Sequence, residues 1–180
     1  MKYKHVIVFV LVVFIASIIT GIIYGINNYY DLSDYINTLN KHNNVFIKDI
    51  IILLFFLFST ISLLGIFIQS IYIGFEGLSV GYIISEFYLN YKFKGIVYSI
   101  INIIINKLLF LLILLYLFFI TYKYTLKIIS NIVGNSNDYI KNIIKPLIKK
   151  YILIFFFLLI IDTIIYFFGN LILNYFTFML

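Results

Sequence analysis

The feature that most constrains this chain is a series of long apolar runs separated by short polar segments. The first run, residues 6–26, holds 21 residues without a charge, about the length that an α-helix needs to cross a bilayer. Of all 180 residues, 64% are hydrophobic and 11% are charged. A soluble domain of this length could not cover so much apolar surface. The sequence therefore predicts an all-α, polytopic membrane helical bundle.

Five spans account for the apolar runs, within one integral membrane domain over residues 1–180. The predicted spans are residues 6–26, 49–68, 70–89, 96–120 and 147–173. The first run could instead be a cleaved signal peptide, but it is longer than a signal peptide's apolar region, which favours an uncleaved helix. Residues 50–89 could form one span plus a re-entrant segment. Because about 40 residues suffice for two crossings, a helical hairpin broken at Gln69-Ser70 is favoured.

The segments between the spans predict how the protein is oriented. An outer loop at residues 27–48 contains Asp31, which could cap a short amphipathic helix. A turn at 90–94 precedes the fourth span. A basic inner segment at 121–150 has a turn at Gly134 to Asn137, and Pro146 suits the first turn of the last helix.

Lysine placement favours an inner N-terminus and an outer C-terminus. The inner segments then carry eight lysines, namely Lys2, Lys4, Lys123, Lys127, Lys141, Lys145, Lys149 and Lys150. The outer segments carry four, namely Lys41, Lys48, Lys92 and Lys94. This bias obeys the positive-inside rule. The net charge of +6 therefore indicates orientation and contact with anionic lipid rather than nucleic-acid binding.

The third span carries a stripe of small residues. Its members are Ser70, Gly74, Gly77, Gly81 and Ser85, spaced four, three, four and four apart. At about 100° per residue they share one face of a helix. Gly77 and Gly81 form a GxxxG pair, and Gly21 and Gly25 form a second pair in the first span. Small residues let two membrane helices approach closely, so the stripe predicts a packing face for a partner helix or a second copy.

The predicted spans also contain a few charged and polar residues. They are Glu76, Glu86, Asn102, Asn106, Lys107 and Asp162. Lys107 and Asp162 lie at similar distances from the inner ends of their spans, which predicts an ion pair between them. Such pairs either fix how the helices align or form a proton or ion path. The first interpretation is favoured because no second carboxylate or histidine continues a relay.

The residue inventory argues against an enzyme. The chain has no cysteine, and its two histidines, His5 and His42, fall outside the predicted membrane core. No Ser–His pair, zinc site or glycine-rich phosphate loop can therefore form there. The sequence predicts no catalytic residue, no metal and no cofactor.

The layout resembles the stage II sporulation protein M family of bacterial inner-membrane proteins. The residues that carry the resemblance are IGFEGLSVGYIIS at 73–85, followed by KGIVYS at 94–99 at the start of the fourth span. The family has five predicted spans, an N-terminal anchor and a polar outer loop. Where the family has a proline-containing polar stretch, this chain has Ile105, Asn106 and Lys107, so Lys107 is particular to this protein.

The resemblance implies a non-enzymatic role in the bacterial cytoplasmic membrane. Members of the family act in spore engulfment with stage II sporulation proteins D and P, which remodel peptidoglycan. We therefore expect a multi-pass scaffold that contacts the lipid bilayer and other membrane proteins. Two alternatives stay open. One is a transporter or permease subunit that uses the intramembrane charges around a polar cavity, and the other is a lipid-handling role of the basic segment 121–150.

Overall fold

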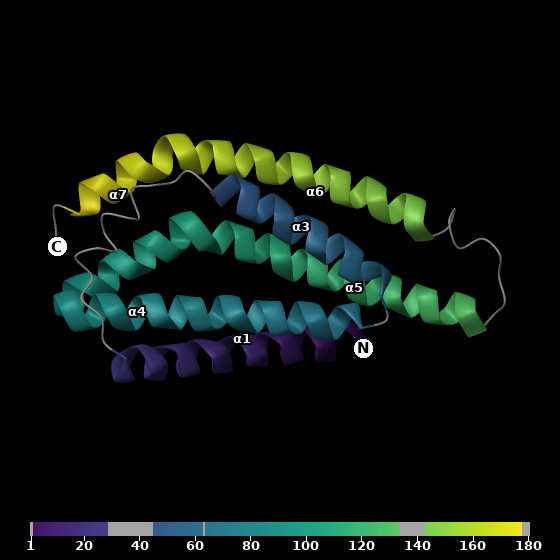
Figure 1. Cartoon of the computed structure of the whole chain (residues 1–180), viewed down its shortest axis with the longest axis horizontal. Helices are drawn as coiled ribbons and strands as arrows, with labels where there is room; N and C mark the ends of the chain where they lie inside the picture. The colour runs from purple at the N-terminus through teal and green to yellow at the C-terminus, as the bar shows by residue number, and fades with distance from the viewer. Residues whose placement is uncertain (1, 29–44, 63, 134–142, 178–180) are drawn as a thin grey trace.

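The computed structural model describes residues 2–28, 45–62, 64–133 and 143–177, and these residues form a bundle of long helices (Figure 1). In chain order the elements are α1 (Lys2–Asn27), α3 (Val45–Ile61), α4 (Gly65–Ile103), η1 (Ile104–Leu108), α5 (Leu109–Val133), α6 (Lys145–Ile164), η3 (Ile165–Gly169) and α7 (Asn170–Thr177). The two η elements are single π-helical turns that join α-helices end to end. The predicted all-α class is confirmed for the described residues.

Within the described part of the chain, three helical stretches are long and apolar enough to cross a membrane. They are Val8–Asn27, Gly65–Ser130 and Lys145–Leu173, with mean hydropathies of 2.6, 2.7 and 2.6. Large apolar side chains also cover the outside of the bundle. Phe58, Phe67, Phe75, Phe93 and Leu153, for example, are between 62% and 75% exposed. A surface of this kind is suited to lipid rather than to water.

The stretch Gly65–Ser130 is 66 residues long, far more than the roughly 20 that one crossing needs. It folds back on itself within α4, whose ribbon reverses direction at the left of the view (Figure 1). The backbone at Lys92 is non-helical, with φ 55° and ψ −132°. The two limbs on either side, residues 65–91 and 93–133, form an antiparallel hairpin. Lys92 lies inside the segment 90–94 for which the sequence predicted a turn.

The hairpin is tight next to its turn. The rings of Phe87 and Tyr98, one from each limb, have centroids 4.9 Å apart. Gly95 lies so close to the first limb that a Cβ atom there would overlap the carbonyl oxygen of Phe87. A positive φ at a lysine is unfavourable, so contacts of this kind are needed to hold the reversal in place.

The break between the second and third predicted spans lies earlier than we predicted. We placed it at Gln69-Ser70, whereas α3 ends at Ile61 and α4 begins at Gly65. Gln69 is fully buried, and its amide donates to the carbonyl oxygen of Phe56 at 3.1 Å and to Ser59 Oγ at 2.7 Å. A polar residue in an apolar run marks an interhelical hydrogen bond here rather than a chain break.

The other helix boundaries extend beyond the predicted ones. The fourth predicted span ended at residue 120, but α5 continues to Val133. Pro146 lies in the first turn of α6, as predicted. The amphipathic helix predicted within 27–48 and the turn at Gly134 to Asn137 lie outside the described residues.

The main apolar core lies where α3, α5 and α6 meet. Its fully buried members include Phe56, Leu114, Leu117, Leu147 and Leu158. A smaller cluster near the hairpin turn contains Ile83, Phe87, Tyr98 and Leu173. A third joins α1 to the hairpin through Val10, Ile73 and Phe118. The bundle therefore has α1 on one side of the α4 hairpin and α3 with α6 on the other, an arrangement that can be followed in Figure 1.

Candidate functional site

The small-residue stripe of α4 packs against α1 of the same chain. A Cβ atom on Gly77 would lie 2.8 Å from the carbonyl oxygen of Phe14, and one on Gly81 would overlap the carbonyl oxygen of Ile18. Gly74 faces Ser17. Ser70 and Ser85 are also buried, and each hydroxyl donates to a carbonyl oxygen of its own helix, Ser70 to Ile66 and Ser85 to Tyr82.

The contact is reciprocal, because α1 brings its own two glycines to α4. A Cβ atom on Gly21 would overlap the carbonyl oxygen of Leu78, and one on Gly25 would overlap the hydroxyl of Ser85. We predicted that this face meets a partner helix or a second copy. In the described structure its occupant is α1, so the two GxxxG pairs form one interlocked seam within the chain.

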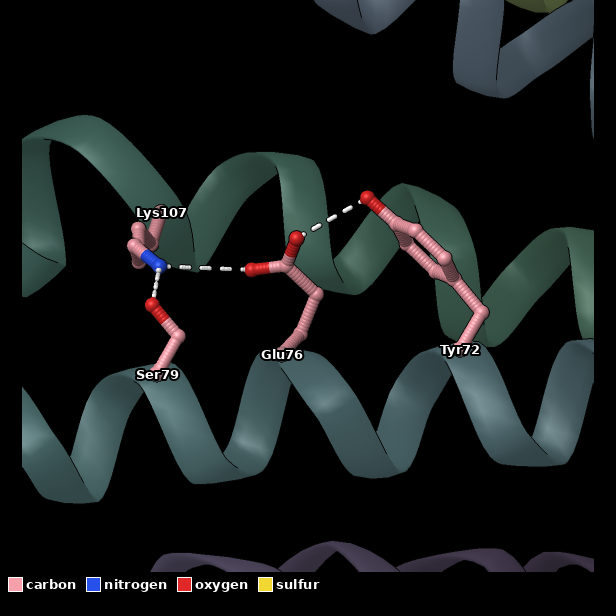
Figure 2. Close-up of polar contacts among 4 residues, drawn as sticks. All are labelled: Tyr72, Glu76, Ser79 and Lys107. Carbon is pink, nitrogen blue, oxygen red and sulfur yellow. Dashed lines mark hydrogen bonds and ion pairs between the residues drawn. The ribbon is translucent and has the colours of Figure 1, made fainter. Parts of the chain in front are cut away.

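An ion pair lies on the other side of α4. Lys107 Nζ is 3.3 Å from Glu76 Oε2 and donates to Ser79 Oγ at 2.5 Å, while the Tyr72 hydroxyl donates to Glu76 Oε1 at 2.9 Å (Figure 2). The two charged side chains are 22% and 12% exposed. Glu76 and Ser79 of the first limb thus hold one ammonium from the second limb, and Tyr72 bonds to Glu76 on the side away from Lys107, as Figure 2 shows.

The predicted ion pair between Lys107 and Asp162 is wrong, because Lys107 pairs with Glu76. Our depth estimate counted from an inner end at residue 120, but the helix runs on to Val133. Gly169 packs against Ile105, and the two helices run antiparallel. Asp162, seven residues before Gly169, therefore lies opposite about residue 112, seven residues after Ile105. At about 1.5 Å per residue, Asp162 lies roughly 8 Å along the helix axis from Lys107.

Lys107 lies within the π-helical turn η1. A π turn holds one extra residue and so changes the direction in which the following side chains leave the helix. The second π turn, η3, packs on η1, where a Cβ atom on Gly169 would lie 3.1 Å from Ile105 Cγ2. Both irregular turns therefore meet close to the ion pair.

Asp49 is a buried charged residue that sequence reasoning treated only as the first residue of a span. It is 5% exposed and interacts electrostatically with Asp162, Lys48 and Glu76. Its helix α3 packs against α6, and Thr60 of α3 bonds to Tyr151 of α6 at 2.8 Å. Asp49 lies eleven residues before Thr60, and Asp162 lies eleven after Tyr151. Because α3 and α6 run antiparallel (Figure 1), the two carboxylates lie at one level.

We use the name charged layer for the group formed by Asp49, Glu76, Lys107 and Asp162. Its members come from α3, α4, η1 and α6, and they contribute three carboxylates and one ammonium. The described residues contain no cluster of three His, Cys, Asp or Glu side chains that could hold a metal ion. A layer of this composition can hold charges in place or exchange a proton, and sequence reasoning missed it because Asp49 was not recognised as buried.

The remaining predicted polar residues lie outside the charged layer. Glu86 is buried towards the hairpin turn, and its Oε1 atom has no hydrogen-bond partner. Asn106 donates to Asn102 at 2.5 Å within the second limb. This bond joins the two asparagines to each other rather than to the charged layer, and Asn106 Oδ1 is buried without a hydrogen-bond partner.

A second buried polar group, the Thr60 cluster, consists of Ser59, Thr60, Gln69, Thr121 and Tyr151. Thr60 Oγ1 lies 2.7 Å from Thr121 Oγ1 and 2.8 Å from the Tyr151 hydroxyl. The Gln69 amide donates to Ser59 and Thr60 at 2.7 and 3.3 Å. The cluster joins α3, α4, α5 and α6. The only sequence signal was that these polar residues interrupt apolar runs.

Family models, curated proteins and solved structures gave no match to the chain. The resemblance to stage II sporulation protein M therefore stays a prediction.

Proposed function

We propose that the chain crosses the membrane five times. The crossings are α1, α3, the two limbs of the α4 hairpin, and α6 with α7. At 17 residues, α3 is about 26 Å long, close to the roughly 30 Å of a bilayer's apolar core. The reversal at Lys92 divides the longest apolar stretch into two limbs, which supports two crossings there.

We further propose an inner N-terminus and an outer C-terminus. One end of the bundle holds the start of α1, the junction of α3 with α4, the end of α5 and the start of α6 (Figure 1). The other end holds the hairpin turn and α7. The first end carries the exposed lysines Lys123, Lys127, Lys145, Lys149 and Lys150. This placement supports an inner position for that end, because cytoplasmic segments are rich in lysine.

The function that we propose is a non-enzymatic scaffold in a bacterial cytoplasmic membrane, of the kind that the resemblance to stage II sporulation protein M implies. The observation that carries the proposal is the interlocked seam between α1 and α4. The seam is formed by Gly74, Gly77 and Gly81, which belong to the segment 73–85 that carries the resemblance. Close backbone contact of this kind makes a rigid support, and the resemblance gives peptidoglycan-remodelling proteins as the partners.

Affinity purification of the tagged chain from bacterial membranes in mild detergent, followed by mass spectrometry, tests the scaffold role. We expect peptidoglycan-remodelling proteins, such as stage II sporulation proteins D and P, to accompany the wild type. The variant with Gly77→Leu and Gly81→Leu should lose them, because leucine cannot fit against α1. A matched variant, Ile71→Leu and Phe75→Leu, changes exposed residues of the same helix and should retain them. Recovery of an ATPase or a permease as the main partner would contradict the scaffold.

The second candidate function is a transporter or permease subunit, and the charged layer is the observation that favours it. Ionisable groups inside a membrane bundle commonly mark ion or proton pathways. This function predicts that Asp162→Asn abolishes flux while the protein level is unchanged. The scaffold predicts that the same variant still recruits its partners in full.

A further inference from the structure

Two carboxylates of the charged layer, Asp49 and Asp162, lie on neighbouring helices, and neither forms an ion pair among the described residues. Asp49 is 5% exposed and forms no hydrogen bond or ion pair with another described residue. Asp162 Oδ2 is buried and has no hydrogen-bond partner. The equal spacing of Asp49 and Asp162 from the bonded pair Thr60 and Tyr151 puts them at one level of α3 and α6. Asp49 interacts electrostatically with Asp162.

The neighbouring charges do not neutralise this pair. On α4, Glu76 adds a further negative charge, and the Tyr72 hydroxyl donates its hydrogen bond to Glu76. On η1, the ammonium of Lys107 is engaged by Glu76 and Ser79. On α3 itself, Lys48 interacts with Asp49, but its side chain is exposed and forms no ion pair with it among the described residues.

Ionisation of both carboxylates of such a pair is unfavourable, because each negative charge disfavours the other and burial, almost complete for Asp49 and partial for Asp162, disfavours both. The usual solution is that such a pair holds one proton in common. A metal ion needs more oxygen ligands than two carboxylates supply, and the described residues around the pair offer no third acidic ligand in reach.

We propose that Asp49 and Asp162 form a proton-binding site that holds one proton between α3 and α6. Release of this proton changes the net charge of the pair from −1 to −2, and its uptake reverses the change. No other chemical change takes place. This proton-binding site is independent of the scaffold role, because α3 and α6 lie on the opposite side of the α4 hairpin from α1 (Figure 1). Sequence reasoning found no such site because it lacked a second carboxylate near Asp162.

Infrared difference spectroscopy of the full chain in lipid nanodiscs tests this proposal, since a protonated carboxyl group has its own carbonyl band. For the wild type we expect one protonated carboxyl group that titrates away as the pH is raised. In Asp49→Asn and in Asp162→Asn the remaining acid lacks a charged neighbour, so it should lose its proton at a pH lower by about one unit or more. Glu86→Gln, which changes a buried carboxylate outside the charged layer, should leave this step in place.

Two results would overturn the site. One is a titration step that stays at the same pH in both single variants. The other is loss of the band at fixed pH when sodium chloride replaces choline chloride, because the pair would then hold sodium rather than a proton. If a single variant fails to fold, the double variant Asp49→Asn with Asp162→Asn, which carries no repulsion, replaces it. Persistence of the step in the double variant would equally contradict the proposal.

Discussion

Lys107 Nζ lies 3.3 Å from Glu76 Oε2, and this ion pair joins two residues that are 31 positions apart in the chain. Glu76 precedes the reversal at Lys92 by 16 residues and Lys107 follows it by 15. The pair therefore fixes how the two limbs of the hairpin align. Breaking it leaves an unpaired charge within the bundle, which is costly.

Glu76→Gln should destabilise the protein by about 3 kcal/mol, because it leaves the partly buried ammonium of Lys107 without its counter-charge. Thermal unfolding in detergent or nanodiscs measures the change. The exchanged variant, Glu76→Lys with Lys107→Glu, should recover most of the loss. If Glu76→Gln unfolds at the wild-type temperature, the pair does not align the limbs.

Tyr72→Phe removes one hydrogen bond to a charged acceptor and should cost about 1.5 kcal/mol. The Tyr72 hydroxyl donates to Glu76 at 2.9 Å, so its loss also weakens the ion pair. Tyr116 is 54% exposed, and Tyr116→Phe therefore serves as the control, with no expected change in unfolding temperature. Equal stability of the two variants would exclude a role for Tyr72 in the site.

The seam between α1 and α4 can be tested by disulfide formation, because the chain has no cysteine of its own. A Cβ atom on Gly74 would lie 3.3 Å from Ser17 Oγ, so Ser17→Cys with Gly74→Cys should form a disulfide on mild oxidation. Adding Gly81→Leu should prevent the crosslink by displacing α1. Adding Phe75→Leu, on the exposed face of α4, should not. A crosslink that survives Gly81→Leu would show that the seam tolerates a large side chain.

The Thr60 cluster predicts a contrast between two threonines. Thr60→Val leaves the Tyr151 hydroxyl and the Gln69 amide with one partner fewer in a buried site, which should cost about 2 kcal/mol. Thr125 is buried, and its hydroxyl has no hydrogen-bond partner. Thr125→Val should therefore be neutral or slightly stabilising. Denaturation of both variants under the same conditions measures the difference, and a reversed order would rule out the cluster as a stabilising contact.

The sequence was sufficient to predict the helical class, because apolar runs of span length have few other solutions in a membrane. It also predicted a turn around Lys92 and a close-packing face on residues 70–85. It did not reveal that α1 occupies that face, since spacing along a helix identifies a face but not the helix that meets it. The comparisons leave the family untested, so the sporulation-type role stays a prediction.

The arrangement of the charges could not be derived from the sequence for a related reason. The depth of Lys107 depends on where its helix ends, and α5 runs thirteen residues beyond the predicted end at 120. The burial of Asp49 depends on the packing of α3 against α6, which no local pattern encodes. Members of the Thr60 cluster are likewise recognised only when their helices are brought together.

The most direct test of the five-crossing bundle is the accessibility of two single cysteines, at Ser62→Cys and Lys92→Cys. Both positions are exposed, one at the junction of α3 with α4 and the other at the hairpin turn. A membrane-impermeant maleimide applied to intact cells should label the cysteine at 92 and not the one at 62, and inside-out vesicles should give the reverse. Labelling of both positions from the same side would contradict the account, because residues 65–91 would then form a re-entrant segment rather than a crossing.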